Sequence, residues 1–229
     1  MPKTRSKRFR AALERVDRTK RYPLEEAVAL VKKNAVAKFD ETVEVSMRIG
    51  VDPKKGDQQV RGSVILPHGL GGKARTVLVF AEGEKAKEAL AAGADHVGGA
   101  ELVEKVAGGW TEFDVAIAVP GMMRHVGKLG KVLGPQGKMP SPKAGTVSDD
   151  VTTAVKAYKA GKVEYRVDAG ANVAGPVGKA SFTAEKIAEN VRSFVESVRA
   201  AEPHTSKGQY LRRVVLSTTM GPGVQLDIA

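Results

Sequence analysis

The spacing of apolar residues changes twice along this chain, and these changes constrain the fold more than any other feature. In TVEVSMRIGVD, apolar residues alternate with polar ones from Val43 to Val51, which predicts a strand with one buried and one solvated face. In RTVLVFA (75–81) the apolar run is continuous, which is typical of a strand covered on both faces. After Gly161 the alternation returns in KVEYRVD and VQLDI. A half-exposed sheet therefore flanks a segment of different architecture.

The middle segment repeats strand-like and helix-like stretches in turn. After RTVLVFA come the helix-like EKAKEALAAGA, then ADHVGG, the helix-like AELVEKVAGG and the strand-like FDVAIAV. DDVTTAVKAYKAG closes the segment as a helix that begins at an acidic pair and ends at Gly161. This βαβαβα order predicts a mostly parallel sheet with helices on its faces, a Rossmann-like three-layer α/β domain.

The two flanking segments are predicted to fold together. Helices are expected from Pro23 onward and over 184–201, but neither flank contains enough strands for a stable sheet of its own. We expect one discontinuous α+β domain, residues 1–67 and 160–229, with the α/β domain, residues 68–159, inserted into it. Lys and Arg outnumber Asp and Glu by 25 to 16 in the flanks and by 12 to 10 in the insert, so the basic charge belongs mainly to the discontinuous domain.

The composition narrows the class of partner. A net charge of +11 and a pI near 9.8 indicate a polyanion, either nucleic acid or an anionic membrane surface. The apolar runs are far shorter than the roughly 20 residues of a spanning helix, which argues against a membrane. Aromatic residues make up 5%, too few for wide base-stacking platforms, and the absence of cysteine fits a reducing cytosol. Residues 1–21 carry nine Lys or Arg, and this segment is either a basic arm, a solvated helix with Phe9, Leu13 and Val16 on one stripe, or both.

No catalytic pattern is present in the sequence. The tract GKLGKVLGPQGKMPSPKAG (127–145) ends like a phosphate-binding loop at Gly137 and Lys138, but Val132 replaces the first glycine and Met139 the hydroxyl residue. A dinucleotide fingerprint and an activated nucleophile are also lacking, and the four histidines are scattered. We expect a protein that is not an enzyme and that has no cofactor and no metal site.

Four separated motifs carry a resemblance that runs nearly end to end. They are AKFDETVEVSMRIGVDPKKGDQQVRGSVILPHG, LGKVLGPQGKMPSPKAGTV, GPVGKASF and STTMGPGVQLDI, and together they resemble the bacterial large-subunit ribosomal protein one family, the protein of the mobile side stalk. The resemblance implies a two-domain fold and a cytoplasmic protein that is a monomer when free and otherwise part of the large ribosomal subunit. It also implies three RNA partners: large-subunit rRNA, exit-site tRNA whose deacylated form it helps to release, and the mRNA of its own operon, which it represses.

The resemblance also implies binding residues. For rRNA, the KFDET and TTMG segments supply the matching positions Lys38, Phe39, Glu41, Thr42, Thr219, Met220 and Gly221. The YRVD segment supplies two less certain positions, Arg166 and Asp168. Two departures affect the less certain pair, because Arg213 stands where relatives often have a small hydroxyl residue and Ala169 where a lysine commonly follows the aspartate. For tRNA or a secondary rRNA surface, the resemblance suggests the lysines of the glycine-rich tract, Lys128, Lys131, Lys138 and Lys143, although a structural loop with solvated lysines is the alternative.

Two other functions remain open from the sequence. One is a nonribosomal RNA-binding regulator of the same fold, and the other is a nucleotide-dependent enzyme that uses the α/β insert.

Overall fold

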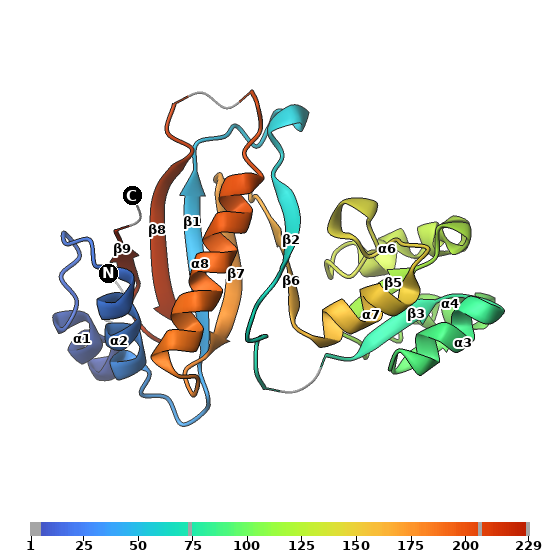
Figure 1. Ribbon diagram of the computed structural model, residues 1–229, viewed down its shortest axis with the longest axis horizontal. Coiled ribbons are helices and arrows are strands. Elements are labelled where there is room, and N and C mark those ends of the chain that lie inside the picture. Colours follow the sequence, from blue (N-terminus) through green and yellow to red (C-terminus); the bar gives the residue numbers. More distant parts are fainter. Residues whose placement is uncertain (1–5, 73–74, 206–207, 228–229) are drawn as a thin grey trace. The chain divides into compact units, whose positions relative to one another are not determined.

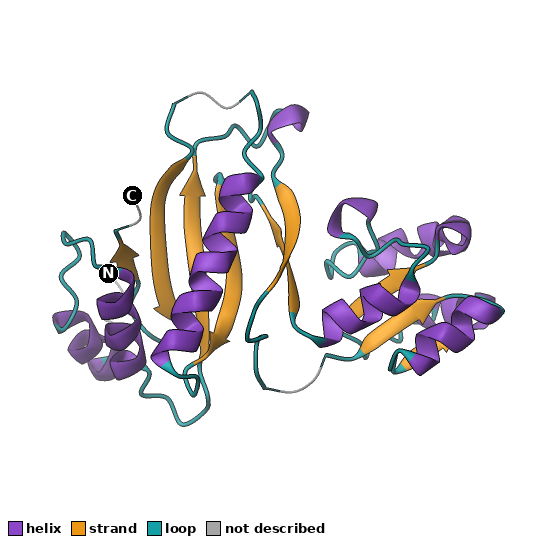
Figure 2. Cartoon of the chain, in the orientation of Figure 1, coloured by secondary structure: helices purple, strands orange, loops and turns teal. Residues whose placement is uncertain are grey.

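The computed structural model describes residues 6–72, 75–205 and 208–227 and divides into two compact units. The first unit combines Met1–Gly72 with Val163–Ala229, and the second is Lys73–Lys162. Both units contain helices and strands (Figures 1 and 2), which confirms the mixed α+β and α/β class. The sequence analysis placed the two crossings at residues 67 and 160, whereas the units divide at Gly72 and Lys162.

The first unit is built on a four-stranded antiparallel sheet. β1 (Thr42–Ile49) lies between β7 (Asn172–Lys179) and β8 (Leu211–Thr218), and β9 (Val224–Leu226) pairs with the outer side of β8. Burial alternates along β1 as its sequence predicts, with Val43, Val45, Met47 and Ile49 buried. One face of this sheet is therefore the wall of a core, and the other is polar.

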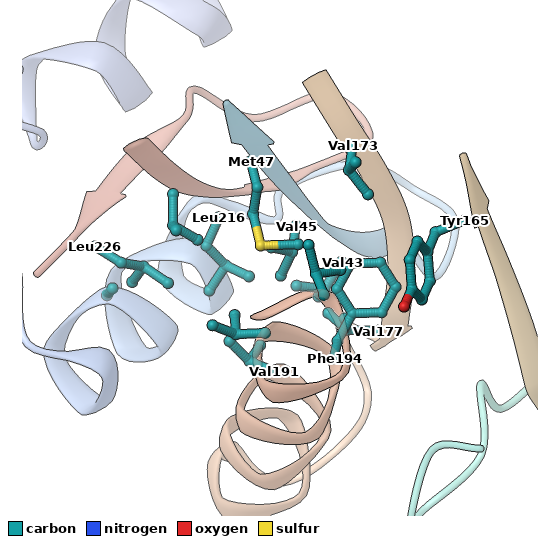
Figure 3. Close-up of a cluster of buried hydrophobic side chains, with 14 of the residues drawn as sticks. Val43, Val45, Met47, Tyr165, Val173, Val177, Val191, Phe194, Leu216 and Leu226 are labelled. Carbon is teal, nitrogen blue, oxygen red and sulfur yellow. The ribbon is translucent and has the colours of Figure 1, made fainter. Parts of the chain in front are cut away.

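Helices cover only the apolar face of this sheet. α8 (Ala184–Ala200), capped by the hydroxyl of Thr183, crosses that face, and α2 (Leu24–Asn34) packs beside it (Figure 1). Figure 3 shows Phe194 and Val191 of α8 meeting Val45 and Leu216 of the sheet. α1 (Lys7–Glu14) is a short helix that precedes α2. It lies in the segment for which the sequence allowed a basic arm, a solvated helix or both.

Strand β7 was not predicted, because its sequence NVAGPVGK is interrupted by glycine and proline. Gly175 is required there, since a Cβ at this position would lie 2.6 Å from the Phe194 ring. Pro176 is tolerated because β7 is an edge strand of the sheet. The pairing register shifts between Val43 and Glu44, so that Val177 forms a bulge. Contacts with α8 and the edge position thus permit a strand that the local sequence does not indicate.

A two-stranded ribbon completes the first unit. β2 (Arg61–Ile65) pairs with β6 (Lys162–Arg166), and a short 3-10 helix, η1 (Gly56–Gln58), precedes β2. The chain after β2 is fixed to α8 by the buried side chain of Asn190, which accepts the His68 N–H at 3.1 Å and donates to the Gly69 carbonyl oxygen at 3.0 Å.

The second unit contains a three-stranded parallel sheet, as predicted, and its strand order is β4-β3-β5. The strands are β3 (Val77–Phe80), β4 (His96–Gly98) and β5 (Val115–Ala118), and the helices are α3 (Glu84–Ala91), α4 (Ala100–Ala107) and α7 (Val151–Lys159). Leu78 and Phe80 join one apolar cluster, whereas Val77 and Val79 join another on the opposite face. These two clusters explain the continuous apolar run, because both faces of β3 are covered.

The glycine-rich tract belongs to a chain of very short helices in this unit. They are η2 (Pro120–Met122), α5 (Met123–Val126), η3 (Gly127–Leu129), α6 (Gly130–Leu133) and η4 (Pro142–Ala144). Val126, Leu129 and Leu133 anchor this segment in the core, so the tract is a packed element rather than a free arm.

Candidate nucleic-acid interface

The solvated side of the four-stranded sheet forms a continuous polar surface, which we call the open face. Successive side chains of a strand point to opposite faces of the sheet. The open face therefore carries the strand residues that alternate with the buried ones. The strand register aligns these residues across β7, β1, β8 and β9 as Lys179, Thr42 and Thr219; Pro176, Glu44 and Ser217; Ala174, Ser46, Val215 and Gln225; and Asn172, Arg48 and Arg213.

The middle of the open face combines short side chains with one exposed carboxylate. Ser46 lies between Ala174 and Val215, and the exposed Glu44 lies between Pro176 and Ser217. Around Ser46 the backbone of a partner can approach the sheet closely. The basic groups lie at the two ends of the face, named here the Thr42 end and the Arg48 end after residues of β1.

At the Thr42 end, two loops are joined by hydrogen bonds. The Thr219 N–H donates to the Thr42 carbonyl oxygen at 3.0 Å, and the Thr42 N–H donates to the Thr219 hydroxyl at 3.0 Å. The Thr219 hydroxyl in turn donates to the Thr42 carbonyl at 3.3 Å, and Lys179 donates to the Thr42 hydroxyl at 2.8 Å. Since a hydroxyl has one donor and two acceptor sites, Thr219 retains one acceptor and Thr42 retains its donor.

Glu41 holds the same two loops from beneath. Its side chain accepts the Ala37 N–H at 2.9 Å and the Met220 N–H at 3.0 Å, and the residue is only 1% exposed. Burial alone would raise the pKa of this carboxyl, but these backbone donors and the nearby charge of Arg8 lower it below its ordinary value. The sequence analysis placed Glu41 among the RNA contacts, whereas the structure buries it, so it positions the loops rather than presenting its carboxylate to a partner.

Three apolar side chains are exposed on these loops. Phe39 is 54% exposed, Met220 49% and Val36 48%, among five large apolar residues that are exposed in the part of the chain described. Lys38 is also exposed. Gly221 is required by packing, because a Cβ there would lie 2.4 Å from the Thr218 hydroxyl. The sequence analysis did not identify Val36, which becomes a candidate only because its loop lies beside the Met220 turn.

The predicted rRNA residues fall at both ends of the open face rather than in one cluster. Arg166 is exposed, and the bridge between Val167 and Val173 brings the end of β6 beside β7 near the Arg48 end. Thr42 and Arg48 are six residue steps apart along β1, which corresponds to about 20 Å. The candidate residues at the two ends therefore cannot contact the same nucleotide.

Asp168 has a structural role at the Arg48 end. Its carboxylate accepts the N–H groups of Asn172 at 2.7 Å and Gly170 at 2.8 Å and closes the turn between β6 and β7. The Asn172 backbone N–H is the main reason why the pKa of Asp168 lies below its ordinary value. The side-chain amide of Asn172 also donates to the other carboxylate oxygen at 3.2 Å, so both oxygens of Asp168 are engaged within the turn.

The four lysines of the glycine-rich tract do not share one environment. Lys128 and Lys131 are exposed on η3 and α6. Lys138 instead donates to the carbonyl oxygens of Thr111, at 3.0 Å, and Phe113. Its ammonium group therefore connects the tract to the loop that precedes β5. The side chain of Lys143 lies outside the described residues.

Within residues 6–72, 75–205 and 208–227, no group of three or more His, Asp or Glu residues is arranged to hold a metal ion. None of the helices in these ranges has the length and apolar character needed to cross a membrane.

A family model described as the ribosomal protein L1p/L10e family matches residues 31–222. This chain belongs to that family. The matched range contains both ends of the open face and the glycine-rich tract, and it confirms the resemblance found in the sequence. The ribosomal protein L1p/L10e family consists of RNA-binding proteins of the ribosome and is not an enzyme family. The chain is accordingly a ribosomal RNA-binding protein whose partner is rRNA of the large subunit.

Proposed function

We propose that the open face of the four-stranded sheet is the surface that binds large-subunit rRNA in the side stalk. The supporting observation is the Thr42 end, where exposed apolar side chains and partly free hydroxyl groups lie together on hydrogen-bonded loops. RNA is recognised through its ribose hydroxyls, phosphates and unstacked bases, and this end offers a partner for each. The domain boundaries and the rRNA-binding residues named from the sequence are part of this proposal, except that Glu41 positions the loops instead of contacting RNA.

The chemistry at the Thr42 end suits a ribose and its neighbouring phosphate. The remaining acceptor site of Thr219 can receive a 2′-hydroxyl, and the remaining donor of Thr42 can bind a phosphate oxygen. Phe39 and Met220 supply the apolar surface on which a sugar or a base edge packs, and Lys38 adds a positive charge. Glu41 keeps these groups in place through its two backbone hydrogen bonds.

This proposal is tested by measuring the affinity of the full chain for an rRNA fragment from the side stalk. The double variant Phe39→Ala/Met220→Ala is expected to bind at least tenfold more weakly, a loss of about 1.4 kcal/mol. Leu90→Ala is the matched control, because Leu90 is equally exposed at 57% but lies on α3 of the second unit. Equal binding by wild type and the double variant would rule out the Thr42 end as the rRNA site.

We further propose that the chain acts on the ribosome, in the cytoplasm, by assisting release of deacylated tRNA from the exit site. Lys128 and Lys131 support this role because both are exposed and basic. The double variant Lys128→Gln/Lys131→Gln should keep its rRNA affinity within about threefold, roughly 0.7 kcal/mol, and should slow departure of tRNA from reconstituted ribosomes. Unchanged tRNA departure would remove these two lysines from the proposal.

Repression of the operon mRNA is proposed to use the same open face. If one surface serves both RNAs, rRNA and the leader segment of the operon mRNA compete for the free, monomeric protein. A competition binding assay with both RNAs tests this directly, and simultaneous binding would show that repression needs a different surface.

A further inference from the structure

Two arginines face each other across neighbouring strands at the Arg48 end of the open face. The register pairs Arg48 of β1 directly with Arg213 of β8, and both side chains are exposed. Like charges in directly opposed positions destabilise a sheet. Among the described ion pairs, none involves either residue. The folded protein therefore keeps two unneutralised positive charges side by side.

None of the described ion pairs joins a neighbouring acid to this pair. On its other side, Arg48 is paired with the neutral Asn172. Asp168, in the turn before Asn172, keeps its negative charge, but its carboxylate accepts the N–H groups of Asn172 and Gly170 and is not ion-paired with either arginine. Arg166 of β6 adds another exposed cation near this end.

The regular strand register sets the position of Arg213. Val214 pairs with Met47 and stays in the core, so the next residue, Arg213, lies on the open face opposite Arg48. The register shifts only after this pair, where Ile49 pairs with Leu211 and leaves Arg212 as the extra residue of a bulge.

We propose that Arg48 and Arg213 form a clamp for a phosphate group of the same rRNA that is bound at the Thr42 end. This inference rests on the proposed function of the open face. Guanidinium groups bind phosphate through paired hydrogen bonds, and one phosphate held between two of them offsets their mutual repulsion. Between the two ends, the short side chains of Ser46 and Ala174 allow a close approach, and the exposed carboxylate of Glu44 lies between Ser46 and the Thr42 end. The rRNA contact accordingly runs along about 20 Å of β1.

The clamp has a measurable signature in the salt dependence of binding. Because the clamp holds one phosphate, the double variant Arg48→Gln/Arg213→Gln should flatten the plot of log affinity against log salt concentration by about 0.7 to 0.9. Arg48→Gln and Arg213→Gln alone should each weaken rRNA binding and each flatten the plot by part of that amount. The melting temperature of free Arg213→Gln should not fall and is expected to rise, because a like-charge pair is removed.

Arg192→Gln is the matched control. Arg192 is exposed on α8, on the side of the sheet opposite the open face, and its substitution removes the same charge. Its salt slope should equal that of the wild type.

The outcomes separate this inference from the proposal on which it rests. Failure of the wild-type chain to bind side-stalk rRNA would overturn the proposed function. If the wild type binds, but the Arg48→Gln and Arg213→Gln slopes match that of Arg192→Gln, the clamp is wrong and the Thr42 end alone holds the RNA. A lower melting temperature with an unchanged slope would assign the two arginines a structural role and also overturn the clamp.

Discussion

Replacement of Glu41 by Gln tests whether a buried carboxylate organises the proposed RNA site. The Glu41 carboxylate accepts two backbone N–H groups, from Ala37 and Met220, and is 1% exposed. Gln has the same shape but only one acceptor oxygen, so its amide group must face one of these donors. Leaving one buried donor without its charged acceptor costs about 2 to 3 kcal/mol.

The loss should be visible in thermal unfolding and should depend on pH. For a chain of this size, we expect the melting temperature of Glu41→Gln to fall by about 5 to 10 °C at pH 7. Because folding lowers the pKa of Glu41, its stabilising effect is present above the ordinary pKa and disappears as the pH falls through the lower, folded-state value. The difference between wild type and variant should therefore shrink below about pH 4.

Glu44→Gln provides the control for this experiment. Glu44 is exposed on β1, three residues after Glu41, so the identical chemical change should alter stability by less than about 0.5 kcal/mol. If Glu41→Gln melts at the wild-type temperature at pH 7, or if its deficit is the same at pH 7 and pH 3, the carboxylate does not hold the two loops in the manner described.

Three further predictions follow from the contacts. Thr219→Val should weaken rRNA binding about five- to tenfold, close to 1 kcal/mol, and should slightly lower the melting temperature because the Thr42 N–H loses its acceptor. Filter binding measures the affinity and calorimetry measures the melting temperature. Unchanged affinity would mean that the hydroxyl is purely structural. Replacing residues 73–162 with a short Gly/Ser linker should leave a first unit that melts cooperatively and binds rRNA, since loop closure depends weakly on length; a non-cooperative transition would contradict the discontinuous domain. Gly175→Ala should destabilise the chain by about 1 to 3 kcal/mol, because its Cβ would meet the Phe194 ring at 2.6 Å; chemical denaturation tests this, and wild-type stability would show that α8 can shift.

The sequence predicted the strands in which burial follows a regular pattern from residue to residue. The alternation in β1 and the continuous run in β3 identified a half-exposed sheet and a doubly covered one, because burial on one face or two leaves different periods in the sequence. β7 and β8 were missed for physical reasons that lie outside their own residues. β7 depends on the ring of Phe194 above Gly175, and in β8 the alternation is interrupted at the bulge of Arg212.

The sequence named candidate residues one by one but not their geometry. Only the register of β1 with β7 and β8 shows which residues of these strands lie on one face of the sheet. The burial of Glu41 and the carbonyl bonds of Lys138 result from long-range contacts, so nothing in the neighbouring sequence distinguishes these residues from exposed ones. For the same reason, the opposition of Arg48 and Arg213 is invisible in a sequence where they lie far apart.

The sequence of the edge strand β7 affects how readily the protein aggregates before it binds RNA. A sheet with an uncovered face and a free outer strand is prone to add strands from other molecules, and such pairing leads to aggregation. Here the outer strand contains Pro176, which lacks an N–H, and a bulge at Val177 that twists the strand, while Val167 bridges it at Val173. These features leave few consecutive backbone groups for an incoming strand. The same residues that made β7 unpredictable from its sequence therefore disfavour self-association of newly made, unassembled protein.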